Sequence, residues 1–425
     1  MTKLHLIESM GDNLYFNPET LELIDVRNNV SESNIAKLDS SKEKAQPIPH
    51  IKSIEVQRSN VIDRITLCVS NDCNLRCKYC YAHGGDYGTG RKLMDTGTAV
   101  DFVNFCFREF DKINQILFFG GEPLLNWRII DVVCSSFVKV CNQKKIPLPK
   151  FSLITNGTIL NEDILQLIKR YISFITISID GIKIVNDSNR VFQNGSGTYD
   201  KISHFINKVK EINPLYIGFE ATYTRTHLQL GLTRHSVKSF LQSEFGINGI
   251  VVDEDSLGVQ QMINNIHNIG KLDIIESDFD CLPMDFWVIL KSIATKKEHR
   301  FCGILYDRFT VTVDGSIIGC QMLINRGQNV ISNIYSKGVY DIIKKHTPEF
   351  KKSQECMNCW CNPLCGGCCI GRFLEDCNGK ISNIPNRNVC QLTAKYIEAI
   401  LILIYKIRSD NELWPKLIKK CQNKY

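Results

Sequence analysis

The alternation of strand-like and helix-like runs between residues 61 and 256 limits the fold of this 425-residue chain more than any other feature. The strand-like runs are short and apolar, and the runs between them repeat apolar residues at helical spacing. This pattern predicts an α/β fold, a partial (β/α)6 TIM-like barrel with its chemistry at the carboxyl ends of parallel strands. The predicted strands span residues 65–69, 115–119, 151–155, 174–179, 215–223 and 249–252, and the predicted helices span 95–112, 127–143, 162–171, 199–212 and 236–244.

Three cysteines follow the first predicted strand in a C-x3-C-x2-C spacing, Cys73, Cys77 and Cys80. Three thiolates from one loop can hold three corners of a [4Fe–4S] cluster, which leaves the fourth iron open to a substrate or cofactor. A zinc knuckle and a disulfide loop are the alternatives. Structural zinc requires a fourth ligand, for which His83 is the nearby candidate, and it usually occurs with paired C-x2–4-C units.

With Tyr79 directly before the third cysteine, this stretch resembles the signature of the radical SAM superfamily. The resemblance implies that the open iron binds S-adenosylmethionine (SAM) and that Tyr79 lies near its adenine. Gly-Gly-Glu-Pro at residues 120–123 ends the second predicted strand and resembles the family's motif for the methionine amino group. Glycine allows close backbone approach, and a glutamate accepts hydrogen bonds from an ammonium, although this tetrapeptide taken alone is an ordinary turn.

Polar residues also end the third and fourth predicted strands, where the family binds the carboxylate and ribose of SAM. Taken alone they are ordinary turn and capping residues, and Asp180 and Asn156 would equally serve only to shape their turns. Glu220, in the fifth predicted strand, is expected either to face the barrel mouth or to be a paired core carboxylate. The implied SAM-binding residues are Tyr79, Ala82, Gly120, Gly121, Glu122, Pro123, Asn156, Ser178, Asp180 and Arg190.

The chain contains 19 cysteines and begins without a recognisable secretory signal, a combination that indicates metal binding and not disulfides. We therefore expect a cytoplasmic protein in a reducing, anaerobic cell. The formal net charge of +6 is mild and is explained by charged residues on a solvated surface. We therefore expect no nucleic-acid partner. No run of about 18 apolar residues occurs, and no membrane partner is expected either.

Cysteines return in the last third of the chain in the order C-x12-G-x4-C, C-x2-C-x5-C-x3-C and a final C. This order resembles the SPASM extension of radical SAM enzymes, which implies two auxiliary clusters and so three [4Fe–4S] clusters in all. A zinc ribbon would explain only two of the C-x2-C pairs. By resemblance, Cys302, Cys320 and Cys369 hold the first auxiliary cluster, and Cys356, Cys359, Cys365 and Cys390 hold the second. Cys361, Cys368 and Cys377 have no place in the pattern, so the first cluster has either an open iron or one of these as its fourth ligand.

These features divide the chain into five parts. Residues 1–60 form an N-terminal β-hairpin and linker, a reduced or absent leader-recognition module, and residues 61–256 form the radical SAM barrel. Residues 257–300 are a connector, residues 301–391 are the iron–sulfur SPASM domain, and residues 392–425 are a C-terminal helix.

The resemblance implies reductive cleavage of SAM to a 5′-deoxyadenosyl radical that abstracts hydrogen from an unactivated carbon. The leading hypothesis is a maturase of a ribosomally made precursor peptide that joins a cysteine sulfur to a carbon, as in sactipeptide and ranthipeptide maturation. Residues 84–88 and 91–94 look like those of such thioether-forming relatives. An electron donor such as flavodoxin or ferredoxin, and a separate leader-binding protein, are the other partners this reading implies.

Two alternatives belong to other classes. An anaerobic sulfatase-maturing (formylglycine-generating) enzyme is expected to carry a proton-accepting aspartate after the G-x4-C cysteine, where this chain has Gln321, and a carboxamide is no base. A non-enzymatic iron–sulfur electron carrier would have no use for the motif at residues 120–123 on a strand end.

Overall fold

The structure, a computed structural model, describes residues 4–9, 12–25, 60–212, 216–253, 276, 279, 282, 284–295, 303–324, 330–345, 354–365 and 387–424. The chain forms two compact units. The barrel unit comprises residues 58–257 and 303–348, and the second unit comprises residues 1–57, 258–302 and 349–425.

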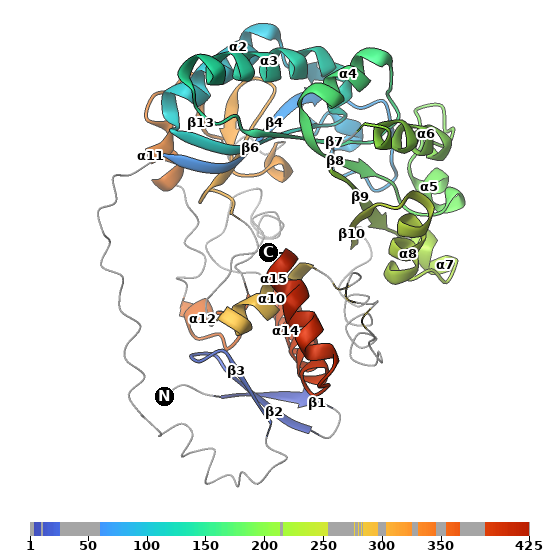
Figure 1. Ribbon diagram of the computed structural model, residues 1–425, viewed down its shortest axis with the longest axis vertical. Helices are drawn as coiled ribbons and strands as arrows, with labels where there is room; N and C mark the ends of the chain where they lie inside the picture. Colours follow the sequence, from blue (N-terminus) through green and yellow to red (C-terminus); the bar gives the residue numbers. More distant parts are fainter. Residues whose placement is uncertain are drawn as a thin grey trace. The chain divides into compact units, whose positions relative to one another are not determined.

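The barrel unit is built on a sheet in which all six predicted strands occur in parallel (Figure 1). Pairing follows chain order, so each crossover helix returns the chain to the next strand on the same side, as the sequence alternation predicts. The strands are β4 (Val61–Asn71), β6 (Lys112–Gly120), β7 (Lys150–Thr155), β8 (Ile172–Ser178), β9 (Tyr216–Tyr223) and β10 (Asn248–Asp253).

The five predicted crossover helices are present, and they lie along one face of the sheet (Figure 1). Asp95 caps the first of them, because its carboxylate accepts a hydrogen bond from the Thr98 backbone N–H. The helices are α2 (Thr96–Glu109), α3 (Trp127–Lys144), α4 (Glu162–Tyr171), α6 (Tyr199–Lys210) and α8 (Arg234–Phe245). Two short helices that the periodicity does not predict, α5 (Lys183–Asn189) and α7 (Arg225–Gln229), follow the carboxyl ends of β8 and β9.

The sheet continues beyond the predicted barrel. Strand β11 (Arg308–Val311) pairs in parallel with β4, and β12 (Ser316–Ile318) and β13 (Val330–Asn333) extend it antiparallel. The sequence placed these strands in a separate iron–sulfur domain that starts at residue 301, whereas residues 303–348 pack with the barrel. Local sequence gives no sign of this, since the pairing of β11 with β4 joins segments more than 240 residues apart.

The second unit contains a three-stranded antiparallel sheet and several helices around one apolar core. Strands β1 (His5–Ser9), β2 (Asp12–Asn17) and β3 (Glu22–Asp25) lie where the N-terminal β-hairpin is predicted. In place of a single helix at residues 392–425, the structure has two, α14 (Arg387–Arg408) and α15 (Leu413–Lys424). Helices α10 (Met284–Thr295) and α12 (Gln354–Met357) are the other helices described in this unit, while the linker predicted after the hairpin lies outside the described residues up to residue 59.

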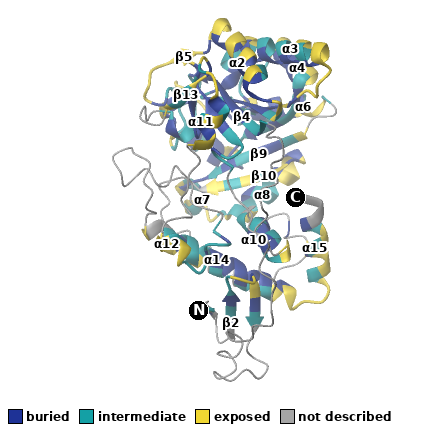
Figure 2. Ribbon diagram, turned by 90° about the vertical axis from the view of Figure 1, so that its left-hand side faces the viewer, coloured by how far each residue is buried: buried dark blue, intermediate teal, exposed yellow. Residues whose placement is uncertain are grey.

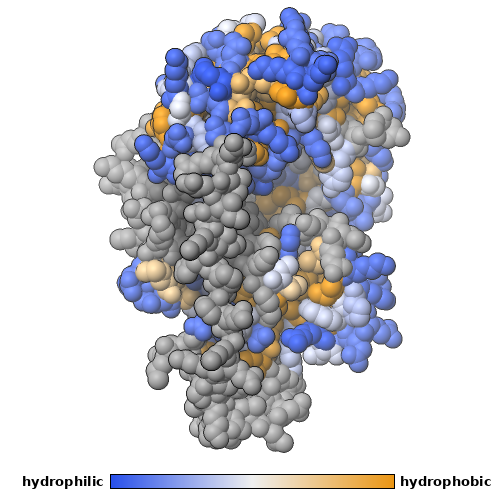
Figure 3. Space-filling view, turned by 60° about the vertical axis from the view of Figure 1, so that its left-hand side comes forward, coloured by the Kyte–Doolittle hydropathy of each residue, from blue (hydrophilic) through white to orange (hydrophobic). Residues whose placement is uncertain are grey.

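Buried residues concentrate in the strands of the barrel unit and exposed residues on its outer helices and loops (Figure 2). On the face shown in Figure 3, that unit presents mostly hydrophilic residues with small apolar areas between them. Among the described helices, none has the length and apolar character needed to cross a membrane.

Candidate functional site

The loop that carries Cys73, Cys77 and Cys80 begins at the carboxyl end of β4. Its backbone N–H groups donate hydrogen bonds to the end of α5 and the segment that follows it. The Arg76 N–H donates to the Val191 carbonyl at 2.7 Å, and the Lys78 N–H donates to the Asn189 carbonyl at 3.0 Å. The Arg76 guanidinium also donates to the Cys73 and Leu75 carbonyls at 2.8 and 2.6 Å. Hydrogen bonds to the backbone of residues 189 and 191 therefore help to set the path of the loop.

The glycines at residues 120 and 121 are required because the backbone of the cysteine loop packs directly against the end of β6 and leaves no room for a Cβ atom. A Cβ on Gly120 would lie 2.1 Å from the Ser70 carbonyl oxygen, and one on Gly121 would lie 2.3 Å from that of Asp72. A Cβ on Gly85 would lie 2.6 Å from the Cys73 Cβ. The sequence assigned the glycines of residues 120–121 to ligand approach. In the structure they let two chain segments pack together, and the Gly120 carbonyl accepts a hydrogen bond from the Tyr87 hydroxyl at 2.9 Å.

Glu122 is fully buried, and its carboxylate ties β6 to β7. One oxygen accepts hydrogen bonds from the Thr155 hydroxyl and the Leu124 N–H, at 2.7 and 3.0 Å. The other accepts one from the Asn156 N–H at 2.7 Å. Burial raises the pKa of Glu122 to about 7 against these donors. A carboxylate has about four acceptor positions, so one position remains for the ammonium that the motif implies.

The Cys73 sulfur has the surroundings of a metal ligand. It accepts from the Leu75 N–H at 3.4 Å and lies 3.7 Å from the Asn156 side-chain amide, and N–H donors of this kind tune iron–sulfur ligands. Among the described residues no three His, Cys, Asp or Glu side chains are placed to hold one metal ion.

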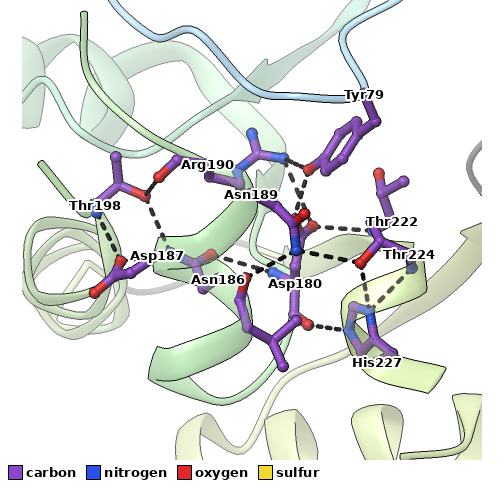
Figure 4. A network of polar contacts seen from close by, with 11 residues as sticks. Tyr79, Asp180, Asn186, Asp187, Asn189, Arg190, Thr198, Thr222, Thr224 and His227 are labelled. Carbon is purple, nitrogen blue, oxygen red and sulfur yellow. Dashed lines mark hydrogen bonds and ion pairs between the residues drawn. The ribbon is translucent and has the colours of Figure 1, made fainter. Parts of the chain in front are cut away.

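Tyr79, Asp180 and Arg190 form a buried polar contact beside this loop (Figure 4). The Tyr79 hydroxyl donates to Asp180 Oδ2 and accepts from Arg190 Nη1, both at 2.6 Å. Burial raises the pKa of Tyr79, so the phenol stays protonated and able to donate. The Arg190 Nε is buried and has no hydrogen-bond partner among the described residues. An anionic or hydroxyl-rich ligand such as SAM would satisfy that nitrogen.

Further residues support this contact, of which Thr198, Thr224 and His227 were not singled out in the sequence (Figure 4). His227 accepts from the Thr224 N–H at its Nδ1, so its Nε2–H donates to the Asp180 carbonyl at 2.7 Å. Asn186 accepts from the Asp180 N–H and donates to the Thr198 hydroxyl, which in turn donates to the Arg190 carbonyl. Helix α7, which carries His227, is too short to show periodicity, so only its position after a strand could have indicated this histidine.

Ala82, Pro123, Asn156 and Ser178 complete the predicted set. Pro123 is buried and begins a short 3₁₀ helix, η2 (Pro123–Asn126). Ala82 is buried, and its carbonyl accepts from the N–H groups of Gly85 and Tyr87. The Asn156 side chain bonds Asn74 and the Thr158 backbone, which is a turn-shaping role. Ser178 is half-buried at the end of β8, opposite Glu220 of β9.

Cys320 lies in the barrel unit, directly after β12, and is buried. Its thiol donates to Gln321 Oε1 at 3.5 Å. The other two cysteines predicted for the first auxiliary cluster, Cys302 and Cys369, lie outside the described residues.

In the second unit, Cys356, Cys359 and Cys365 are half-buried on one short segment, and Cys390 lies in the first turn of α14. Cys361, which has no place in the predicted pattern, is buried between two of them. Its sulfur lies 3.4 Å from that of Cys359, and its thiol also bonds Cys365. Cys368 and Cys377 lie outside the described residues.

Residues 67–243 match the family model described as the Radical SAM superfamily. In sequence the chain is 23% identical over 375 residues to the radical SAM cyclopropyl synthase TigE of Paramaledivibacter caminithermalis, covering 81% of this chain and 75% of TigE. It is 24% identical over 347 residues to a cysteine-type anaerobic sulfatase-maturating enzyme of Clostridium novyi, covering 74% of this chain and 90% of that enzyme. These matches place a radical SAM domain at residues 67–243, and SAM and a [4Fe–4S] cluster are the cofactors that this family implies.

Solved structures confirm the fold. The SAM-bound sulfatase-maturating enzyme anSMEcpe superposes with a TM-score of 0.66 at 19% identity, over 85% of this chain and 100% of that chain. SuiB of Streptococcus suis, solved with SAM, gives a TM-score of 0.51 at 14% identity, over 89% of this chain and 96% of that chain. The likeness to these two structures is one of fold.

Proposed function

We propose that this chain modifies a ribosomally made peptide by joining a cysteine sulfur to a carbon, as a thioether. Two relatives support a peptide substrate: SuiB was solved bound to its precursor peptide SuiA, and anSMEcpe was solved with the Cp18Cys peptide. Both share the fold of this chain.

The position of Cys320 is the observation that carries the proposal. Strand β12 is joined through β11 to β4, so one continuous sheet leads both into the Cys73–Cys80 loop and to Cys320, two residues after β12. We infer an auxiliary cluster that Cys320 holds in part. Such a cluster can accept the electron that is left when a carbon radical forms a bond to sulfur.

When bound, the loop cluster and SAM supply a radical that removes a hydrogen atom from carbon. The residues of this chain position SAM and exclude water. Glu122 would offer its remaining acceptor position to the methionine ammonium, and Arg190 Nε, which has no partner among the described residues, would bind a polar group of SAM. Tyr79 holds Arg190 in place from the cysteine loop.

Formylglycine formation is disfavoured by the contact between Cys320 and Gln321. The Gln321 amide oxygen accepts from the thiol at 3.5 Å, in the place where the sulfatase-maturing resemblance expects a carboxylate base. A carboxamide does not take up a proton near neutral pH.

The similarity to TigE over 81% of this chain favours a second candidate, the closure of a carbon ring. A thioether and a cyclopropane both remove two hydrogens from a substrate. The two products differ in the cysteine thiol of the peptide, because only thioether formation consumes that thiol.

The test uses the peptide encoded next to the gene in a short cysteine-containing reading frame, with reconstituted, reduced enzyme and SAM. We expect a product lighter by two hydrogens that no longer reacts with iodoacetamide, and no such product from a Cys→Ser peptide. A product of that mass with a reactive thiol would favour ring closure. A product that loses sulfur and gains an aldehyde would contradict the proposal, and an enzyme that makes no 5′-deoxyadenosine would be an electron carrier.

A further inference from the structure

Glu220 stands on the inner face of the barrel sheet. In β9, Phe219, Ala221 and Tyr223 are buried in the core between the sheet and the helices. Side chains alternate along a strand, so Glu220 faces the opposite side. Its cross-strand neighbours are Ser178 in β8 and Ile250 in β10, and Ile250 is 43% exposed. The carboxylate therefore lies where a substrate in the barrel can reach it.

The other carboxylates near the carboxyl ends of these strands are already occupied. Glu122 accepts three hydrogen bonds. Asp180 accepts from Tyr79 and from the Thr222 N–H, and it lies 3.7 Å from Arg190. Asp72 accepts from the Cys73 N–H and pairs with Arg91. Within the described parts of the chain, the Glu220 carboxylate makes no hydrogen bond and no ion pair, although the residue is half-buried.

The groups that surround Glu220 favour proton uptake. Burial raises the pKa of its carboxyl above the ordinary value, Arg190 lowers it, and Asp180 raises it further. A carboxyl with a raised pKa is a stronger base when ionised and takes up a proton more readily.

We propose that Glu220 is the catalytic base that takes the substrate's thiol proton. This assignment rests on the proposed function and names the group that accepts the thiol proton when the thioether forms. In the step, a C–H bond breaks as its hydrogen atom passes to the 5′-deoxyadenosyl radical, and the S–H bond breaks as its proton passes to Glu220. The C–S bond forms, and the remaining electron passes to an auxiliary iron–sulfur cluster. Gln321 cannot perform this role, because a carboxamide has no basic site.

The experiment measures peptide product per 5′-deoxyadenosine for the full-length reconstituted enzyme and for Glu220→Gln, Glu220→Asp and Glu244→Gln. Glutamine keeps the size of the side chain and removes its basicity. Because a positioned base contributes on the order of 10²–10⁴ in rate, the ratio should fall about 100-fold in Glu220→Gln. Glu220→Asp should retain more product per 5′-deoxyadenosine than Glu220→Gln. Glu244, exposed on α8, is the matched control and should change the ratio less than about twofold.

Two outcomes would overturn the assignment. An unchanged ratio in Glu220→Gln would show that another group takes the proton. A parallel fall of product and 5′-deoxyadenosine would make Glu220 a SAM-binding residue. A wild-type enzyme that forms 5′-deoxyadenosine but no peptide product would instead refute the proposed function, and the base with it.

Discussion

Two cysteine-bearing segments in this molecule are held in different ways. In the barrel unit, the Cys73–Cys80 loop is fixed by backbone hydrogen bonds to residues 189 and 191 and by glycine contacts with β6. In the second unit, the segment 356–365 is held by apolar packing. Trp360 stacks on His5 with ring centroids 3.8 Å apart and meets Phe16 edge-on at 6.0 Å.

This difference indicates how each segment depends on metal. The barrel loop belongs to a large core with a continuous sheet, so its path should persist without a cluster. The second segment packs on a small core made from distant parts of the chain. Small cysteine-rich regions commonly obtain part of their folding energy from metal, and we expect the same of this segment.

The largest effect should come from Cys77→Ala. Removal of one of three ligands should abolish SAM cleavage, and 5′-deoxyadenosine should fall to background. The loop keeps its hydrogen bonds at Arg76 and Lys78, so the barrel unit should retain its amide-exchange protection. Iron content should fall by one cluster.

Cys359→Ala provides the contrast in the second unit. This variant should keep SAM cleavage but lose amide-exchange protection across residues 354–365 and α14. If Cys77→Ala instead unfolds the barrel and Cys359→Ala leaves its unit protected, the contrast between the two segments is wrong.

Gly121→Ala should give the next largest effect. Its new Cβ would lie 2.3 Å from the Asp72 carbonyl oxygen and 2.7 Å from the Gly85 Cα, and both are backbone atoms that cannot rotate away. Overpacking costs about 1–3 kcal/mol, so SAM affinity should fall roughly 5- to 150-fold in a titration. Gly97→Ala is the control, because its Cβ would meet only the flexible Asp95 side chain. Equal SAM affinities for the two variants would show that the contact at Gly121 does not position the loop.

The strands and most helices of the barrel could be predicted because hydrophobic periodicity is local. Helix α4, for example, has a capping asparagine and acidic residues in its first turn, basic residues in its last turn and an apolar face. The placement of β11 beside β4 could not be predicted, because pairing between segments that are distant in sequence leaves no local pattern. The same reason explains why residues 303–348 were assigned to a separate domain.

The motif residues of the candidate site could be predicted, but the contacts between their side chains could not. The spacing of cysteines and glycines is visible in sequence, and so is a strand-end arginine such as Arg190. Sequence could not show that Arg190 meets Tyr79, or that Glu220 lacks a partner among the described residues, because both depend on the register of neighbouring strands. His227 was missed since a lone histidine in a short helix carries no signal of its own.

The smallest effect should come from His5→Ala, which tests the packed segment without touching a cysteine. The His5 ring stacks on Trp360 and its Nε2 lies 2.7 Å from Glu398 Oε1 on α14. An aromatic contact contributes about 0.5–1.5 kcal/mol, and a half-exposed hydrogen bond contributes less than a buried one. Because 1 kcal/mol is about a factor of five in an equilibrium, amide exchange across residues 354–365 should speed up roughly fivefold. His204→Ala, at an exposed position on α6, should leave that exchange unchanged. If His5→Ala leaves amide exchange across residues 354–365 unchanged too, the N-terminal sheet does not stabilise the segment that carries the second set of cysteines.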